Sequence, residues 1–159
     1  ARAKTLGNEN VTFGQGDVSD RSDFEDGSFD LIHSCMFLHE TSYVSMQKIF
    51  AETHRLMAPG GMVLHVEQPQ YDPAMQLFEQ AMRDWDAFYN SEPFWTKMHE
   101  VDLDAYMQKA GFAKESLIHG GVAAVVDTSI FPDSGSDDVE DYGRKAAWHV
   151  VGARKPETV

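Results

Sequence analysis

Apolar residues in this chain form short continuous runs that alternate with segments of helical spacing. The runs at residues 11–13, 29–34 and 62–66 are rich in Val, Ile, Leu and Phe and predict buried strands. Between the last two runs, apolar positions from Met46 to Met57 recur at helical spacing, which predicts a helix. The Pro-Gly-Gly sequence at residues 59–61 follows and is expected to end that helix, because proline cannot continue it.

The second half of the chain continues the alternation. Asp72 followed by Pro73 predicts a helix start, and Asp102 predicts a cap for a later helix that stops at Gly111. The first of these helices has an apolar stripe made of Phe78, Ala81, Met82, Trp85, Phe88 and Tyr89. Residues 114–119, 122–126 and 146–153 are strand-like, and the acidic stretch 132–143 predicts a solvated loop. The pattern predicts one α/β domain over residues 1–159, with a mostly parallel sheet covered by helices on both faces.

Charge and cysteine content exclude several classes of partner. The chain has 13 Lys and Arg against 26 Asp and Glu, a formal net charge of −13. Such a surface disfavours nucleic acid and anionic membranes, and no apolar run approaches the roughly 18 residues of a membrane span. The single cysteine, Cys35, rules out an internal disulfide and indicates a reducing, cytoplasmic location.

Four signals stand in a fixed order within the first 67 residues. They are Gly16-Asp17-Val18 after a strand, the strand at 29–35, the helix end at 55–61 and the strand at 62–67. In this order the chain resembles the second half of the cofactor domain of class I S-adenosylmethionine-dependent methyltransferases. It is similar to the small-molecule enzymes of ubiquinone and menaquinone biosynthesis. The resemblance spans roughly residues 11–112, with an echo at 148–155.

The resemblance implies a Rossmann-like sheet with an antiparallel C-terminal strand and S-adenosylmethionine as cofactor. The first strands, the family's glycine-rich loop and its ribose-binding acid have no counterpart here and are expected before Ala1. The resemblance implies that Asp17 accepts a hydrogen bond from the adenine amino group. It also implies that the backbone amide of Val18 contacts the adenine ring. Backbone at Ser34 and Cys35 is implied to contact the methionine part of the cofactor. For Asp17, the alternative is an ordinary turn after a strand.

Candidate residues for the methyl acceptor follow the same strand ends. His39 is a candidate general base or acceptor-holding group, and a histidine packed at a helix start is the alternative. Glu67 either lines the acceptor pocket or merely leaves the sheet. Phe94 and Trp95 follow Pro93 in a broken segment and are lid candidates, whereas Trp85 and Phe88 fit ordinary core better. The histidines have no metal-ligand spacing, so no metal site is predicted.

The function that this implies is methyl transfer from S-adenosylmethionine to a small-molecule acceptor, as part of a longer chain. The isolated chain is expected to be inactive. One alternative is a non-catalytic, truncated methyltransferase-like module that acts through oligomerisation or a partner. A third hypothesis is a different nucleotide-using enzyme with a doubly wound fold, but the chain has no dinucleotide or phosphate-loop glycine pattern. An unpaired apolar strand at residues 29–34 predicts a homodimer or higher oligomer, with contacts near residues 29–38.

Overall fold

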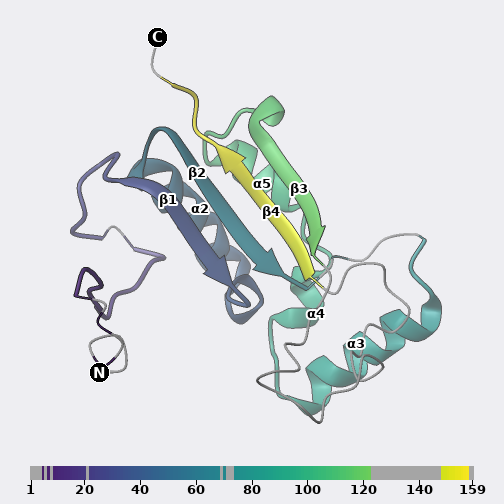
Figure 1. The fold of residues 1–159 in the computed structure, drawn as a ribbon. Coiled ribbons are helices and arrows are strands. Elements are labelled where there is room, and N and C mark those ends of the chain that lie inside the picture. The colour runs from purple at the N-terminus through teal and green to yellow at the C-terminus, as the bar shows by residue number, and fades with distance from the viewer. Residues whose placement is uncertain are drawn as a thin grey trace.

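Four strands form one open sheet in the computed structural model, which describes residues 5, 7, 9–20, 22–68, 70, 74–122 and 148–157 (Figure 1). The strands are β1 (Phe29–Cys35), β2 (Met57–Glu67), β3 (Leu117–Val122) and β4 (Trp148–Arg154), in the spatial order β1-β2-β4-β3. β1 is parallel to β2, and β4 is antiparallel to both of its neighbours. Three strands therefore run one way and the C-terminal strand runs the other, which confirms the predicted Rossmann-like α/β class.

The helices begin where polar side chains can cap them. They are α2 (Tyr43–Leu56), α3 (Leu77–Tyr89), α4 (Trp95–Met98) and α5 (Leu103–Lys109), with 3-10 turns η1 (Leu38–Glu40) and η2 (Lys114–Ser116). Ser42 caps α2 by accepting a hydrogen bond from the Ser45 amide, and Asp102 caps α5 in the same way from Ala105. The predicted Asp102 cap is thus confirmed, and Gly111 ends that helix at φ +113°.

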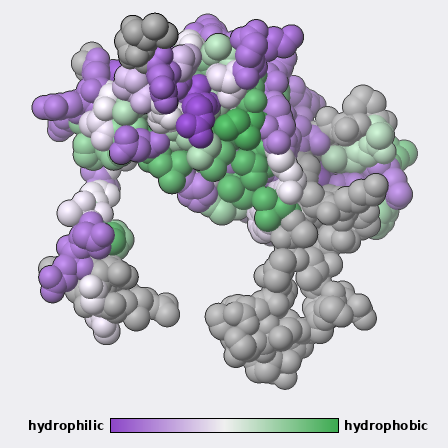
Figure 2. All heavy atoms as spheres, turned by 45° about the horizontal axis from the view of Figure 1, so that its top comes forward, coloured by the Kyte–Doolittle hydropathy of each residue, from purple (hydrophilic) through white to green (hydrophobic). Residues whose placement is uncertain are grey.

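The core lies between the sheet and the helices α2 and α5, which Figure 1 shows behind the sheet. Its main members are Met46, Ile49, Phe50, Met57, Val63, Leu103, Met107, Val151 and Ala153. Along β2, buried residues alternate with half-buried ones, so the second face of the sheet is less covered. Leu31 on β1 is 55% exposed on that second face. Figure 2 shows an apolar band over the middle of the molecule.

Helices cover one face of the sheet in the part of the chain that the structure describes, where both faces were predicted. The helix predicted to start at Asp72 and Pro73 begins instead at Leu77, as α3, because residues 74–76 are not helical and Gln76 is its N-cap; residues 71–73 lie outside the described part. Its apolar stripe does not enter the core: Trp85 is 52% exposed and Phe88 is 77% exposed. The expectation that these two rings are ordinary core is wrong, because α3 packs beside α4 rather than against the sheet.

The structure corrects one predicted strand and two predicted boundaries. Residues 11–13 form no strand and Phe13 is exposed, because no partner strand lies beside them in the described chain. α2 ends at Leu56, so the Pro-Gly-Gly at 59–61 lies inside β2, where the register with β1 shifts. The strand predicted at 114–119 is η2 followed by β3, which continues through the two glycines to Val122. Residues 123–126 and the acidic stretch 132–143 lie outside the described residues.

None of the described helices is both long enough and apolar enough to cross a membrane.

Candidate functional site

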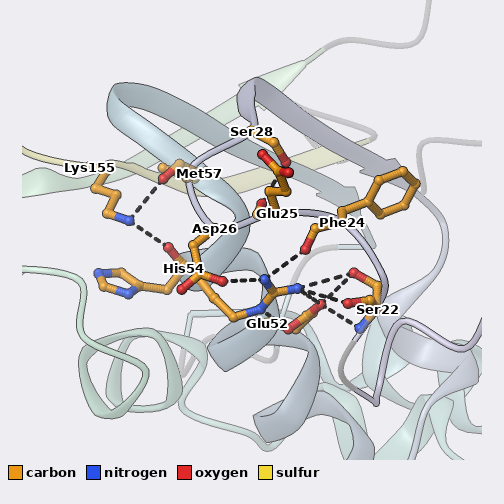
Figure 3. A network of polar contacts seen from close by, with 10 residues as sticks. Ser22, Phe24, Glu25, Asp26, Ser28, Glu52, His54, Met57 and Lys155 are labelled. Atoms are coloured by element: carbon orange, nitrogen blue, oxygen red, sulfur yellow. Dashed lines mark hydrogen bonds and ion pairs between the residues drawn. The ribbon is translucent and has the colours of Figure 1, made fainter.

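An arginine on α2 fixes the loop that follows the Gly-Asp-Val sequence. Arg55 donates hydrogen bonds to the carboxylates of Glu52 and Asp26 and to the backbone carbonyls of Ser22 and Phe24 (Figure 3). Glu52 also accepts from the Ser22 amide and hydroxyl, at 2.9 and 2.7 Å. Hydrogen bonding from Arg55 lowers the pKa of Glu52 to about 2, so this pair stays charged at neutral pH. The loop between the site and β1 is therefore pinned to a rigid helix.

A hollow of about 470 Å³ lies between residues 16–19 and the turn that follows β1. The residues that line it are Gly16, Asp17, Val18, Ser19, Phe37, Glu40, Thr41, Ser42, Ser45, Ile49 and Phe94. It brings Asp17 and Val18 together with the lid candidate Phe94, which is far from them in sequence. Its lining combines the apolar side chains of Val18, Ile49 and Phe94 with polar side chains, a mixture that suits a flat heteroaromatic ring with polar edges.

Asp17 is placed and charged as an acceptor. Its Oδ1 accepts a hydrogen bond from the Ser19 amide at 2.8 Å, and hydrogen bonding from Ser19 lowers the pKa of Asp17. An ionised carboxylate beside the apolar side chains of Val18 and Ile49 can receive the amino group of an adenine ring. The residues present thus fit the adenine end of S-adenosylmethionine.

The end of β1 carries a backbone feature that sequence reasoning missed. Met36 adopts φ +50°, a left-handed conformation that is uncommon for a residue with a side chain. Its amide donates to the Val66 carbonyl at 2.8 Å. Such conformations persist where the surroundings enforce them and gather at functional sites. This turn directs the chain from Cys35 into Phe37, which lines the hollow.

Ser34 and Cys35 themselves do not line the hollow. The Ser34 hydroxyl lies 2.7 Å from His65 Nδ1 on the buried face of the sheet, and Cys35 is exposed. Neither side chain is therefore available to the hollow, and a role for their backbone stays a prediction.

A buried carboxylate organises the turn after β1. Glu67 is 1% exposed, and its Oε1 accepts from the amides of Phe37 and Leu38 at 2.8 and 2.6 Å. Its Oε2 lies 2.8 Å from Nδ1 of His39, which is 4% exposed. Because a carboxylate only accepts, Nδ1 carries the proton of this bond. Glu67 therefore holds η1 and fixes the His39 ring, rather than lining an open pocket.

The two buried histidines near Glu67 differ in their electrostatics. The hydrogen bond with Glu67 raises the pKa of His39 more than burial lowers it, and the charges of Glu67, Glu40 and Glu92 act in the same direction. Burial lowers the pKa of His65 to about 4, so His65 is neutral at pH 7. Of the two, His39 is the one suited to exchange a proton near neutral pH.

The two lid candidates have separate positions. Phe94 lines the hollow with Asp17 and is 37% exposed. Trp95 is 9% exposed and its ring centroid lies 5.3 Å from that of His39, so it packs behind the histidine. Glu92 was not singled out from the sequence, although its carboxylate lies near His39 and Glu40. No local pattern marks Glu92, because the contact joins residues more than fifty positions apart.

Comparisons with known proteins find similarity to methyltransferases. Residues 1–65 match the family model described as a methyltransferase domain. A protein of Synechocystis described as an uncharacterized methyltransferase is 29% identical over 133 residues, which make up 79% of this chain and 61% of the relative. The chain thus spans less than two thirds of the length of that curated relative.

Solved structures share the fold at low sequence identity. Phosphoethanolamine N-methyltransferase 2 of Haemonchus contortus, solved with S-adenosylhomocysteine, gives a TM-score of 0.65 at 16% identity over 98% of this chain and 40% of its own. The [4+2]-cyclase SpnF gives 0.62 at 18% identity, over 99% of this chain and 61% of its own. The same fold therefore occurs in a protein described by a different reaction.

Proposed function

We propose, from the premise that this chain carries the second half of a class I S-adenosylmethionine-dependent methyltransferase domain, that its protein transfers a methyl group to a small-molecule acceptor. The observation that carries the proposal is the hollow shared by Asp17, Val18 and Phe94 at the end of β1. The bound cofactor would supply an electrophilic methyl group. The chain's own part is to bind the adenine end, orient the acceptor and exclude water.

Each predicted residue has a place in this proposal. Asp17 and Val18 hold the adenine, while the backbone at Ser34 and Cys35 approaches the methionine part. His39 faces the acceptor as general base or holding group, and Glu67 positions it from behind. Phe94 covers the hollow, and Trp95 supports the His39 ring.

The experiment is calorimetric titration of S-adenosylhomocysteine into the full-length protein, with Asp17→Asn beside wild type. A hydrogen bond to a charged group contributes roughly 1.5–3 kcal/mol, so the dissociation constant should rise by about 10- to 100-fold. Asp23→Asn changes an exposed carboxylate in the same loop and should leave binding unchanged. Equal dissociation constants for wild type and Asp17→Asn would refute the assignment.

A second candidate is a non-catalytic module that acts by association. The outer edge of β1 has no partner strand among the described residues, and Leu31 is exposed beside it. An open apolar edge favours pairing with a second copy. A protein that binds no S-adenosylhomocysteine at millimolar concentration, yet is a stable dimer, would favour this candidate.

A further inference from the structure

The residues around His39 form a small group of potential ligands at the mouth of the hollow. One ligand atom from each of His39, Glu40 and Glu92 lies within 4.8 Å of the other two. His39 is buried, Glu92 is half-buried and Glu40 is exposed, so the group opens outwards. We propose that these three side chains bind a divalent cation of the Mn²⁺ or Zn²⁺ class.

The His39 ring is oriented as a ligand. Nδ1 is occupied by Glu67 at 2.8 Å, which leaves the Nε2 lone pair directed to the other side, where Glu40 Oε1 lies 3.6 Å away. Histidine ligands of metals almost always donate their second N–H to a carboxylate or carbonyl in this manner. Trp95 stacks on the ring and limits its rotation.

The buried carboxylate behind the ring is itself fixed. Glu67 accepts from two backbone amides of the turn, at 2.8 and 2.6 Å, in addition to His39. An exposed cluster of acids has no such buried support. Here Glu67 fixes the orientation of the His39 ring before any cation binds.

The other two ligands come from elements that meet at this point. Glu40 ends η1, and Glu92 follows α3, where Ser91 adopts φ +60° and the Glu92 amide donates to the Ala87 carbonyl at 2.9 Å. Two carboxylates beside an imidazole repel one another unless a positive charge lies between them, and either a protonated His39 or a bound cation supplies that charge. One nitrogen and two carboxylate oxygens suit Mn²⁺, Fe²⁺ or Zn²⁺ and leave further positions open.

The inferred cation site deepens the proposed function. Only a role of the cation in methyl transfer rests on that proposed function. Glu40 also lines the hollow that holds Asp17, so the cation lies at the rim of the cofactor site. There it offers a positive anchor for an acceptor that carries an anionic or carbonyl oxygen, so that His39 holds the acceptor through the cation and does not act as the general base. Cation binding itself is independent of methyl transfer and is measured without cofactor.

The test is titration of Mn²⁺ into the full-length protein, with free Mn²⁺ counted by electron paramagnetic resonance. Wild type should bind one equivalent saturably. Glu40→Gln and Glu92→Gln should each weaken binding by about 10-fold or more, and Glu67→Gln by about 10- to 100-fold through loss of the ring's support. Circular dichroism checks that each variant is folded. Because Glu40 is exposed and Glu92 is half-buried, replacing either carboxylate with a neutral amide should not disturb the fold.

The matched control is His119→Gln. His119 pairs with Asp104 at 3.1 Å and lies near His149, so it is the place where Mn²⁺ would bind without a built site. This control should leave the affinity unchanged. The inference is overturned if wild type binds no Mn²⁺ below millimolar concentration, if Glu40→Gln and Glu92→Gln bind as wild type does, or if His119→Gln abolishes binding. Loss of S-adenosylhomocysteine binding in Asp17→Asn with Mn²⁺ binding intact would separate the two sites.

Discussion

His65 is a buried imidazole near the end of β2, with Phe50 against its ring and the Ser34 hydroxyl on Nδ1. Its Nε2 has no hydrogen-bond partner among the described residues. Burial therefore favours the neutral ring at pH 7, and protonation of His65 favours the unfolded state. The sequence could not reveal this, because a histidine within an apolar strand looks the same whether it is charged, neutral or functional.

We predict that stability falls as pH decreases from about 6.5 to about 4. The pKa of His65 is about 4 in the folded protein and about 6.5 when unfolded, so the unfolded state binds more protons in this window. The loss amounts to at most roughly 3 kcal/mol. His65→Gln should flatten the pH dependence of the urea midpoint between pH 7 and pH 4.

The control for this measurement is His33→Gln on β1, where the histidine is exposed. It should retain most of the wild-type slope, because burial is the main cause of the lowered pKa of His65 and the charge of His33 contributes less. His39 contributes a slope of the opposite sign, because its folded pKa is raised, and comparison of each variant with wild type removes that contribution. A His65→Gln slope equal to that of wild type would contradict the prediction.

At the residue scale, sequence reasoning named Asp17, Phe94, His39 and Glu67 as candidates, but it did not predict the contacts that hold the loop and the His39 ring. Asp17 followed a strand-like run and preceded a second strand, and both features are local. Arg55 and Glu67 act on partners roughly thirty positions away, and no periodicity reports such a contact. The loop anchor and the carboxylate behind His39 therefore needed the structure.

Among the elements, β4 fits between β2 and β3 only because position 152 has no side chain. A Cβ built on Gly152 would collide with the Val63 carbonyl oxygen and lie 2.9 Å from Leu64 Cδ2. Gly120, on the neighbouring strand, has room, since its Cβ would meet Val150 at 3.9 Å. Gly152 is therefore required by the close packing of β4 against β2, whereas Gly120 is not required by packing.

We predict that Gly152→Ala lowers the free energy of unfolding by roughly 1–3 kcal/mol, because β2 and β4 must separate to admit the methyl group. Gly120→Ala should change it by less than about 0.5 kcal/mol. Urea unfolding of the two variants beside wild type measures both. Equal effects would show that Gly152 is not a packing requirement.

Elements with strong local signals were predicted well. β1, the end of β2, α5 and β4 combine apolar runs or stripes with a clear cap or stop. The boundary between α2 and β2 was misplaced because proline and glycine usually end a helix, whereas here they lie in a strand whose pairing tolerates a shift of register. The strand expected at 11–13 failed for a different reason, since a strand needs a neighbour and propensity does not supply one.

On the scale of the whole molecule, the sheet has two unlike edges. β3 ends it on one side with Val122, and β1 ends it on the other with the exposed Leu31. β1 is the longer of the two, and the apolar band of Figure 2 lies over the sheet. The proposed homodimer or higher oligomer would use the β1 edge.

We predict that the chain at tens of micromolar elutes with at least twice its monomer mass in size exclusion with light scattering. Leu31→Lys should return it to monomer, because a charge at an edge opposes pairing. Val122→Lys places the same charge on the β3 edge and should leave the mass unchanged. A wild-type monomer under these conditions would refute association through β1.

The position of β4 in the sheet also determines the order in which the described strands can pair during folding. β4 is the last strand in sequence, but it lies third in space and is the sole link from β2 to β3 among the described strands. Lys155, just beyond it, ties to the His54 and Met57 carbonyls at the junction of α2 and β2. During synthesis, which proceeds from the N-terminus, β1 and β2 can pair early while β3 waits without a neighbour. The four described strands are therefore joined only once β4 has been synthesised, and a nascent chain stalled before Trp148 would expose β3 to chaperones or to aggregation.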